Sequence, residues 1–251
     1  MEHHNINKTT IINFYSKVLG QGDTHLVDSI IKDDYIQHSP MVKTGKAGFV
    51  EFLAFLKNLP KPESPTKPFF RFICENDLVA VHLSIEFMGQ KKAVMDLFRF
   101  ENGMLAEHWD ASEDIPEISN NKNSVVEGPI NIQDPGLTNT NKSIVRTYTN
   151  EVLIGKKSEW QKYLSEDLIQ HNPELTNGIP SLVSYYRSFE IMNIHRVIGE
   201  GNFVATQSHG KYENSSFVVY DIYRLEEESI VEHWSVKQKI PNKMAHINGM
   251  I

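Results

Sequence analysis

The chain of 251 residues contains an internal repeat, and this repeat restricts its possible folds more than any other feature of the sequence. Residues 71–110 align with residues 196–235 at a constant offset of 125 without a gap, and 12 of these 40 positions are identical. The run Glu-His-Trp stands at 107–109 and again at 232–234. A repeat of this length, which is that of an ordinary domain, predicts two copies of one domain in tandem.

A second match lies upstream at a different offset. YIQHSP at 35–40 corresponds to LIQHNP at 168–173, which is an offset of 133. The difference of eight residues (133 − 125 = 8) places an insertion in the proline-rich segment 59–68 of the first copy, and loops tolerate such insertions. The predicted organisation is a first domain at 1–126, a linker at 127–137 and a second domain at 138–251.

Each copy has helices first and strands afterwards. In the first copy, helical spacing of apolar residues and an N-cap at Asp23 predict helices at 11–19, 24–31 and 46–58, with an extended turn at 35–40. Strands are expected at 69–74, 78–87, 93–101 and 104–110, and Asn102-Gly103 is a strong hairpin signal. This order predicts an α+β fold with helices on one face of an antiparallel sheet.

Composition excludes several classes of function. The net charge of −7 disfavours binding to nucleic acids or anionic membranes, because both carry negative charge. No apolar stretch approaches the roughly 20 residues that span a bilayer. The single cysteine, Cys74, excludes an internal disulfide and a multi-cysteine zinc site, so a reducing, cytoplasmic location is expected.

Two aspartates are the most conspicuous candidates for chemistry. Asp96 and Asp221 occupy equivalent positions in otherwise apolar strands. A buried carboxylate is costly unless it is paired or functional, and a general base can use the raised pKa that burial brings. The alternative is an ion pair that orders the sheet.

Together the YIQHxP turn, the D-x-[FY]-R strand, the hairpin and the EHW[DS] run resemble the SnoaL-like group of the nuclear transport factor 2-like superfamily. The resemblance covers nearly the whole chain. It implies two cone-shaped α+β barrels, each a curved antiparallel sheet wrapped on about three helices with a pocket at its open end. Some relatives are polyketide cyclases that work by aldol condensation, and others are isomerases with a carboxylate base. It also implies an acid/base role for Asp96 and Asp221.

Histidines are the expected partners of these aspartates. The resemblance implies a functional histidine at His82, although the apolar stripe from Val79 to Phe87 places His82 on the other strand face. Copy two has Gln207 there, and His209 is a substitute on the same face. The histidine of the IQH turn either caps the turn or acts on substrate. The catalytic candidates are therefore Asp96, His82, His38, Asp221, His209 and His171.

Further residues are candidates for substrate contact, with burial in the core as the alternative for the tryptophans. They are Tyr35, His108, Trp109, His233 and Trp234. Neighbours on a strand face opposite ways, so at most one of each His-Trp pair enters the pocket. No metal and no cofactor are expected, because histidine spacings typical of metal sites and glycine-rich phosphate loops do not occur.

Three classes of function remain open. The first is cofactor-independent aldol cyclisation or isomerisation of a small apolar carbonyl compound by Asp/His acid–base catalysis. The second is non-catalytic binding of an apolar ligand in the same pocket, and the third is a structural role. Apolar residues on both strand faces also predict an internal pseudo-dimer with sheet packed on sheet, in a chain that is a monomer or a homodimer.

Overall fold

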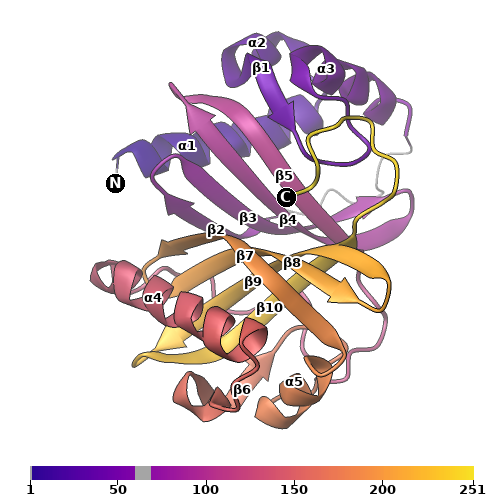
Figure 1. Cartoon of the computed structure of the whole chain (residues 1–251). Helices are drawn as coiled ribbons and strands as arrows, with labels where there is room; N and C mark the ends of the chain where they lie inside the picture. The colour runs from indigo at the N-terminus through magenta and orange to yellow at the C-terminus, as the bar shows by residue number, and fades with distance from the viewer. Residues whose placement is uncertain (1, 60–68) are drawn as a thin grey trace.

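Two five-stranded sheets pack face to face and carry their helices on the outside (Figure 1). This computed structural model describes residues 2–59 and 69–251, so nine of the ten residues of the expected insertion at 59–68 lie outside the described residues. The strand order is β1-β5-β4-β3-β2 in the first sheet and β6-β10-β9-β8-β7 in the second. The identical order confirms a tandem α+β fold.

The first copy contains the elements α1 (Glu2–Asn13), η1 (Phe14–Leu19), η2 (Thr24–Leu26), α2 (Val27–Ile30), β1 (Ile31–Gln37), α3 (Gly45–Leu56), β2 (Phe69–Glu75), β3 (Leu78–Phe87), β4 (Gln90–Glu101) and β5 (Met104–Asp114). The second contains η3 (Pro135–Leu137), α4 (Thr138–Tyr148), η4 (Thr149–Ile154), η5 (Trp160–Lys162), β6 (Leu164–Gln170), α5 (Ile179–Tyr185), β7 (Phe189–Glu200), β8 (Phe203–Tyr212), β9 (Ser215–Glu226) and β10 (Ser229–Lys239).

Strand β1 is the main departure from the sequence prediction. The segment expected to be an extended turn continues a strand that pairs parallel to β5, and β6 pairs parallel to β10. Each sheet is therefore mixed rather than wholly antiparallel. The hairpin at Asn102-Gly103 is as predicted, because both residues have positive φ (54° and 78°), which a tight two-residue turn requires.

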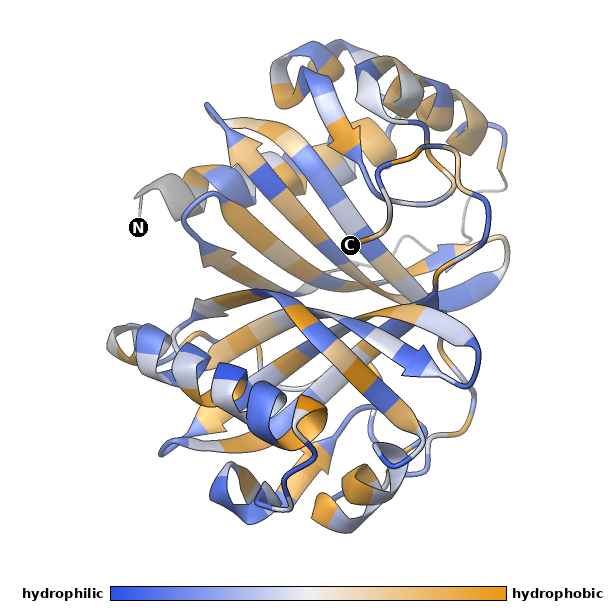
Figure 2. Cartoon of the chain, in the orientation of Figure 1, coloured by the Kyte–Doolittle hydropathy of each residue, from blue (hydrophilic) through white to orange (hydrophobic). Residues whose placement is uncertain are grey.

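Helices cover the outer face of each sheet. In the first copy, Ile11, Phe14 and Val18 pack with Phe49 and the strands into one apolar core, and α4 contributes to an equivalent core in the second copy. Apolar residues run along the strands of both sheets (Figure 2). Among the described residues, no helix is long and apolar enough to cross a membrane.

The inner faces of the two sheets form a third apolar core that belongs to both copies. Strand alternation sends Met95, Leu97 and Trp109 toward the other copy, which supplies Ile222 and Trp234. Both indoles are 1% exposed. Burial of apolar surface is the main driving force for this packing, as in a domain interior.

Polar contacts between the copies come in symmetric pairs. The Cys74 amide donates to Glu200, and the Gly199 amide donates to Glu75, which occupies the position equivalent to Glu200. In the same way the Arg196 guanidinium lies 3.9 Å from the Trp109 ring centre, and Arg71 lies 3.8 Å from Trp234. The copies are therefore related by an approximate two-fold axis.

Truncation of one interface indole tests this packing. We expect Trp109→Ala to lower the free energy of unfolding by about 3–5 kcal/mol, because it opens a cavity between the sheets and removes the contact with Arg196. Urea denaturation measures the loss, with Phe55→Ala, at a 45% exposed position, as the control. A loss no larger than that of the control would contradict the packing.

The covered inner faces also bear on the assembly. Since each sheet already has an apolar partner within the chain, we expect a monomer of 28.8 kDa by light scattering at micromolar concentration. A stable dimer would mean that another surface associates.

Candidate functional site

Asp96 lies in the middle of β4 on the face that the helices cover, and it is 6% exposed. Its Oδ1 lies 3.0 Å from Nε2 of His108 on β5. The hydroxyl of Tyr15, from the turn of helix that follows α1, donates to Oδ2. The Asp96 carboxylate on β4 is therefore held by contacts from β5 and from η1. Phe98 stacks on the His108 ring at a centroid distance of 4.5 Å.

Gln37, at the end of β1, orients His108. Its Oε1 accepts hydrogen bonds from the backbone N–H groups of His38 and Ser39 (3.0 and 2.9 Å), which identifies this atom as the amide oxygen. The same oxygen lies 3.0 Å from His108 Nδ1. Because an amide oxygen only accepts, Nδ1 carries a proton, and Nε2 is the nitrogen that faces Asp96.

The proton between His108 and Asp96 is therefore the one that can move. Burial lowers the pKa of His108, but the hydrogen bond and the negative charge of Asp96 outweigh burial and raise that pKa above its ordinary value. The imidazolium form of His108 is thus favoured beside the Asp96 carboxyl group. An ionised, oriented carboxylate is suited to accept a proton from a substrate.

A second carboxylate stands opposite the first. Asp110 on β5 is the cross-strand partner of Asp96. Burial raises the pKa of Asp110 to about 6, with a smaller opposing effect of His108. Within the part of the chain that the structure describes, its buried Oδ1 has no hydrogen-bond partner. Below about pH 6, a protonated Asp110 is therefore available as a hydrogen-bond donor.

Copy two repeats the centre of this site. His233 Nε2 lies 2.9 Å from Asp221 Oδ1, and His233 Nδ1 lies 2.9 Å from Gln170. Burial and Asp221 raise the pKa of Tyr223, the residue stacked on His233, well above its ordinary value. Ser235 replaces the second carboxylate.

The two copies differ in access. The Asp96 and His108 side chains are 8% and 13% exposed, whereas those of Asp221 and His233 are 2% and 3% exposed. The first copy therefore offers both the second carboxylate and the more open site.

His82, predicted to act with Asp96, does not contact it. Asp96 pairs with Val81 across the strands, so His82 projects to the opposite face, toward the second copy. There its Nδ1 lies 3.0 Å from Arg71. Burial and the charge of Arg71 lower the pKa of His82 well below its ordinary value. The apolar stripe in the sequence had indicated this face, and the predicted partnership was wrong.

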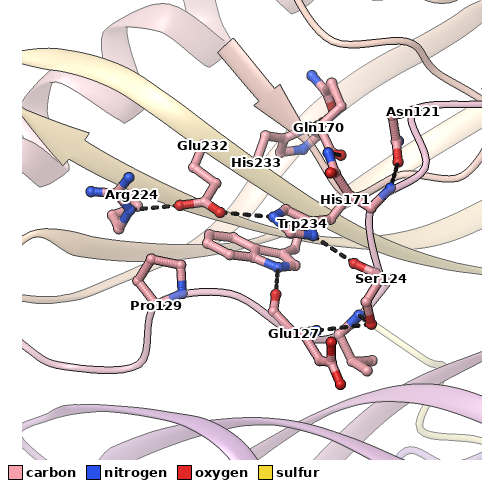
Figure 3. Close-up of polar contacts among 12 residues, drawn as sticks. Asn121, Ser124, Glu127, Pro129, Gln170, His171, Arg224, Glu232, His233 and Trp234 are labelled. Carbon is pink, nitrogen blue, oxygen red and sulfur yellow. Dashed lines mark hydrogen bonds and ion pairs between the residues drawn. The ribbon is translucent and has the colours of Figure 1, made fainter. Parts of the chain in front are cut away.

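His38 and His171 likewise lie between the copies, beside the tryptophans. The His38 ring stacks on Trp109 at 4.7 Å, and His171 stacks on Trp234 at 4.5 Å. His171 Nε2 lies 2.8 Å from Glu232, which also accepts from Arg224 (Figure 3). These histidines are linked to the interface and do not reach the aspartates.

The remaining predicted site residues lie in different parts of the fold. His209 pairs with Val218, whereas Asp221 pairs with Thr206, so His209 lies on the other strand face. Trp109 and Trp234 belong to the core between the sheets, away from the helix-covered face, and Tyr35 is fully buried. Of the predicted substrate-contacting residues, His108 and His233 are the ones that join the aspartates.

Sequence reasoning missed Tyr15, Gln37 and Asp110 as site residues. A signal existed for the first two, because Tyr148 and Gln170 stand at the same offset of 133 as the repeated turn. Asp110 differs between the copies, so the repeat gave no signal for it.

One group of residues could hold a metal ion. Asp96, His108 and Asp110 each present a ligand atom, all within 4.8 Å of one another. Hard divalent cations accept such a set. Two of these groups, however, are already engaged with Tyr15 and Gln37. Cys74 is an unsuitable nucleophile, because burial raises its thiol pKa to about 12.

The raised pKa of Asp110 predicts a pH-dependent cost in stability. The folded protein binds this proton more tightly than the unfolded chain does. Ionisation of Asp110 therefore lowers the free energy of unfolding, with the full effect above about pH 6 and no effect below about pH 4. We expect Asp110→Asn to stabilise the fold by about 1–3 kcal/mol at about pH 8 and by none at about pH 3.5. Urea denaturation at both pH values measures this. The control is Asp114→Asn on the same strand, whose side chain is 67% exposed; an equal gain in the control would contradict the assignment.

One protein family and several solved structures are similar to part of this chain. Residues 9–117 match the family described as SnoaL-like polyketide cyclase. No curated protein matches the chain. Similar solved structures include TsrD from Streptomyces laurentii, with 18% identity and a TM-score of 0.37 over 43% of this chain and 89% of that one. A SnoaL-like polyketide cyclase from Agrobacterium tumefaciens has 11% identity and a TM-score of 0.33 over 39% and 91%.

An LEH-like epoxide hydrolase from M. tuberculosis has 18% identity and a TM-score of 0.34, over 40% of this chain and 84% of that one. The family match covers the first copy, and the second copy has the same strand order and the same Asp-His-Gln arrangement. The first copy thus matches the SnoaL-like polyketide cyclase family over residues 9–117, and a second copy with the same strand order follows it in tandem.

Proposed function

We propose that the first copy catalyses cofactor-independent acid–base chemistry on a small apolar carbonyl compound, as an aldol-type cyclase or an isomerase. The observation that supports this most is the pair of facing carboxylates, one held by Tyr15 and His108 and the other with a pKa of about 6. Two carboxyl groups with different environments can divide the roles of base and acid.

In the proposed reaction, Asp96 accepts a proton from the carbon next to the substrate carbonyl. The electron pair of the broken C–H bond forms the carbon–carbon double bond of the enolate, and the π pair of the carbonyl moves to its oxygen. The protonated Asp110 donates a hydrogen bond to that oxygen. In a cyclase the enolate carbon then attacks a second carbonyl group, whose oxygen takes the proton back from Asp96. In an isomerase Asp96 returns the proton to a different carbon. His108 keeps Asp96 oriented.

The second copy lacks the second carboxylate, and its aspartate is sealed from solvent. We therefore assign the reaction to the first copy alone. The competing function is ligand binding without catalysis, which the buried Asp-His pair would also permit by orienting a polar group.

Proton exchange at the α-carbons of an apolar ketone tests this proposal. We expect the protein to accelerate deuterium incorporation into 2-tetralone in D2O, followed by proton NMR. Asp96→Asn should reduce the rate by about 100-fold or more, since it removes the base. The matched Asp221→Asn variant should keep the rate within about twofold. Loss of exchange in Asp221→Asn with retention in Asp96→Asn would contradict the assignment, and saturable binding without exchange would favour the binding function.

The proposed reaction also requires no metal. We expect exchange activity to survive dialysis against EDTA, because the base and the donor are both supplied by protein groups. Activity lost with EDTA and restored by one divalent cation would instead assign a metal to Asp96, His108 and Asp110.

A further inference from the structure

The segments that follow the last strand of each copy are exchanged between the copies. Residues 121–124 follow the first copy but hydrogen-bond to the second, and residues 246–249 follow the second copy but hydrogen-bond to the first. They are equivalent at the offset of 125. Asn123 donates to the Gln170 carbonyl at 2.8 Å, and Asn248 donates to the Gln37 carbonyl at 2.9 Å. Figure 3 shows the first of these segments passing beside His171 and Trp234.

The C-terminal segment contacts the turn that carries Gln37 at several points. His246 contacts the Ser39 carbonyl at 2.9 Å, and the Ala245 amide donates to the Pro40 carbonyl. The side-chain amide of Asn248 also donates to the hydroxyl oxygen of Thr44. The same oxygen accepts a hydrogen bond from the backbone N–H of Gln37. The backbone of Gln37 is thus fixed on both its N–H and its C=O side.

Fixing Gln37 has a consequence for the site of the first copy. Its side-chain oxygen accepts hydrogen bonds from two backbone N–H groups and from the Nδ1–H group of His108. That last hydrogen bond fixes the ring orientation in which Nε2 faces Asp96. Gln37 therefore connects the C-terminal segment to the His108 ring.

The segment itself is anchored in the interface. Met250 is 2% exposed and belongs to the core between the sheets. Gly249, whose carbonyl contacts His38 at 2.9 Å, has a φ of 78°, a conformation that favours glycine. These features hold Asn248 over the turn.

We propose that Asn248 is a positioning residue of the first copy's site: the second copy, through its C-terminal segment, orients Gln37 and thereby His108. The predicted effect of Asn248 on activity rests on the proposed function, whereas its predicted effect on the orientation of His108 does not. The second copy then serves the first as a structural partner that completes its site.

A matched pair of variants tests this proposal. Asn248→Ala removes the contact with the Gln37 turn, and Asn123→Ala removes the equivalent contact with the Gln170 turn. Nitrogen-15 NMR of the histidine side chains reports the protonation and hydrogen bonding of each ring nitrogen, with His108 assigned from the missing signal of His108→Gln. We expect Asn248→Ala to shift the His108 signals and its titration, while Asn123→Ala leaves them unchanged and shifts those of His233 instead.

Activity provides the second measurement. Exchange of 2-tetralone should fall by about two- to tenfold in kcat for Asn248→Ala with little change in KM, the range that one hydrogen bond supplies, and should stay within about twofold for Asn123→Ala. Urea denaturation checks that both variants remain folded. Equal effects of the two variants on His108 would overturn the proposal. A His108 shift specific to Asn248→Ala, in a protein that catalyses no exchange, would retain the positioning role and refute the proposed function.

Discussion

The structure depends on one indole in each copy, which joins the two sheets. Trp109 contacts His38 of its own copy and Arg196 of the other, and Trp234 repeats this with His171 and Arg71. Alternation along β5 connects this interface to the chemistry, because Trp109 faces the other copy while its neighbour His108 faces Asp96. The strand that holds the copies together therefore also carries the histidine of the site.

Much of the fold could be predicted from the sequence, because repetition and alternation are local patterns. The hairpin strands β3, β4 and β5 carry apolar residues at regular spacing and a strong turn signal. Strand β1 could not be predicted in this way. Its sequence, IKDDYIQ, has three consecutive charged residues, and its pairing with β5 is parallel and distant in the chain. Only tertiary contacts make this segment a strand.

The site shows the same division between local pattern and long-range contact. The aspartates stood out because a charge in an apolar strand is conspicuous. The partner histidine was misjudged because the family resemblance implied His82, while the alternation of its strand had indicated the interface face. Contacts such as Asn248 to Gln37 join residues more than 200 positions apart, and no spacing in the sequence indicates them.

The two copies have diverged unevenly, and the interface explains where. His38, Arg71, Glu107 and Trp109 each have an identical equivalent in the second copy, and each contacts the interface. Around the aspartates, by contrast, Asp110 has become Ser235, Phe98 has become Tyr223 and Tyr35 has become Leu168. A matched contact can constrain an interface residue, and where His82 has become Gln207 the replacement keeps the contact with the neighbouring arginine. A site needs no such match, so one copy can lose a carboxylate and still support its neighbour.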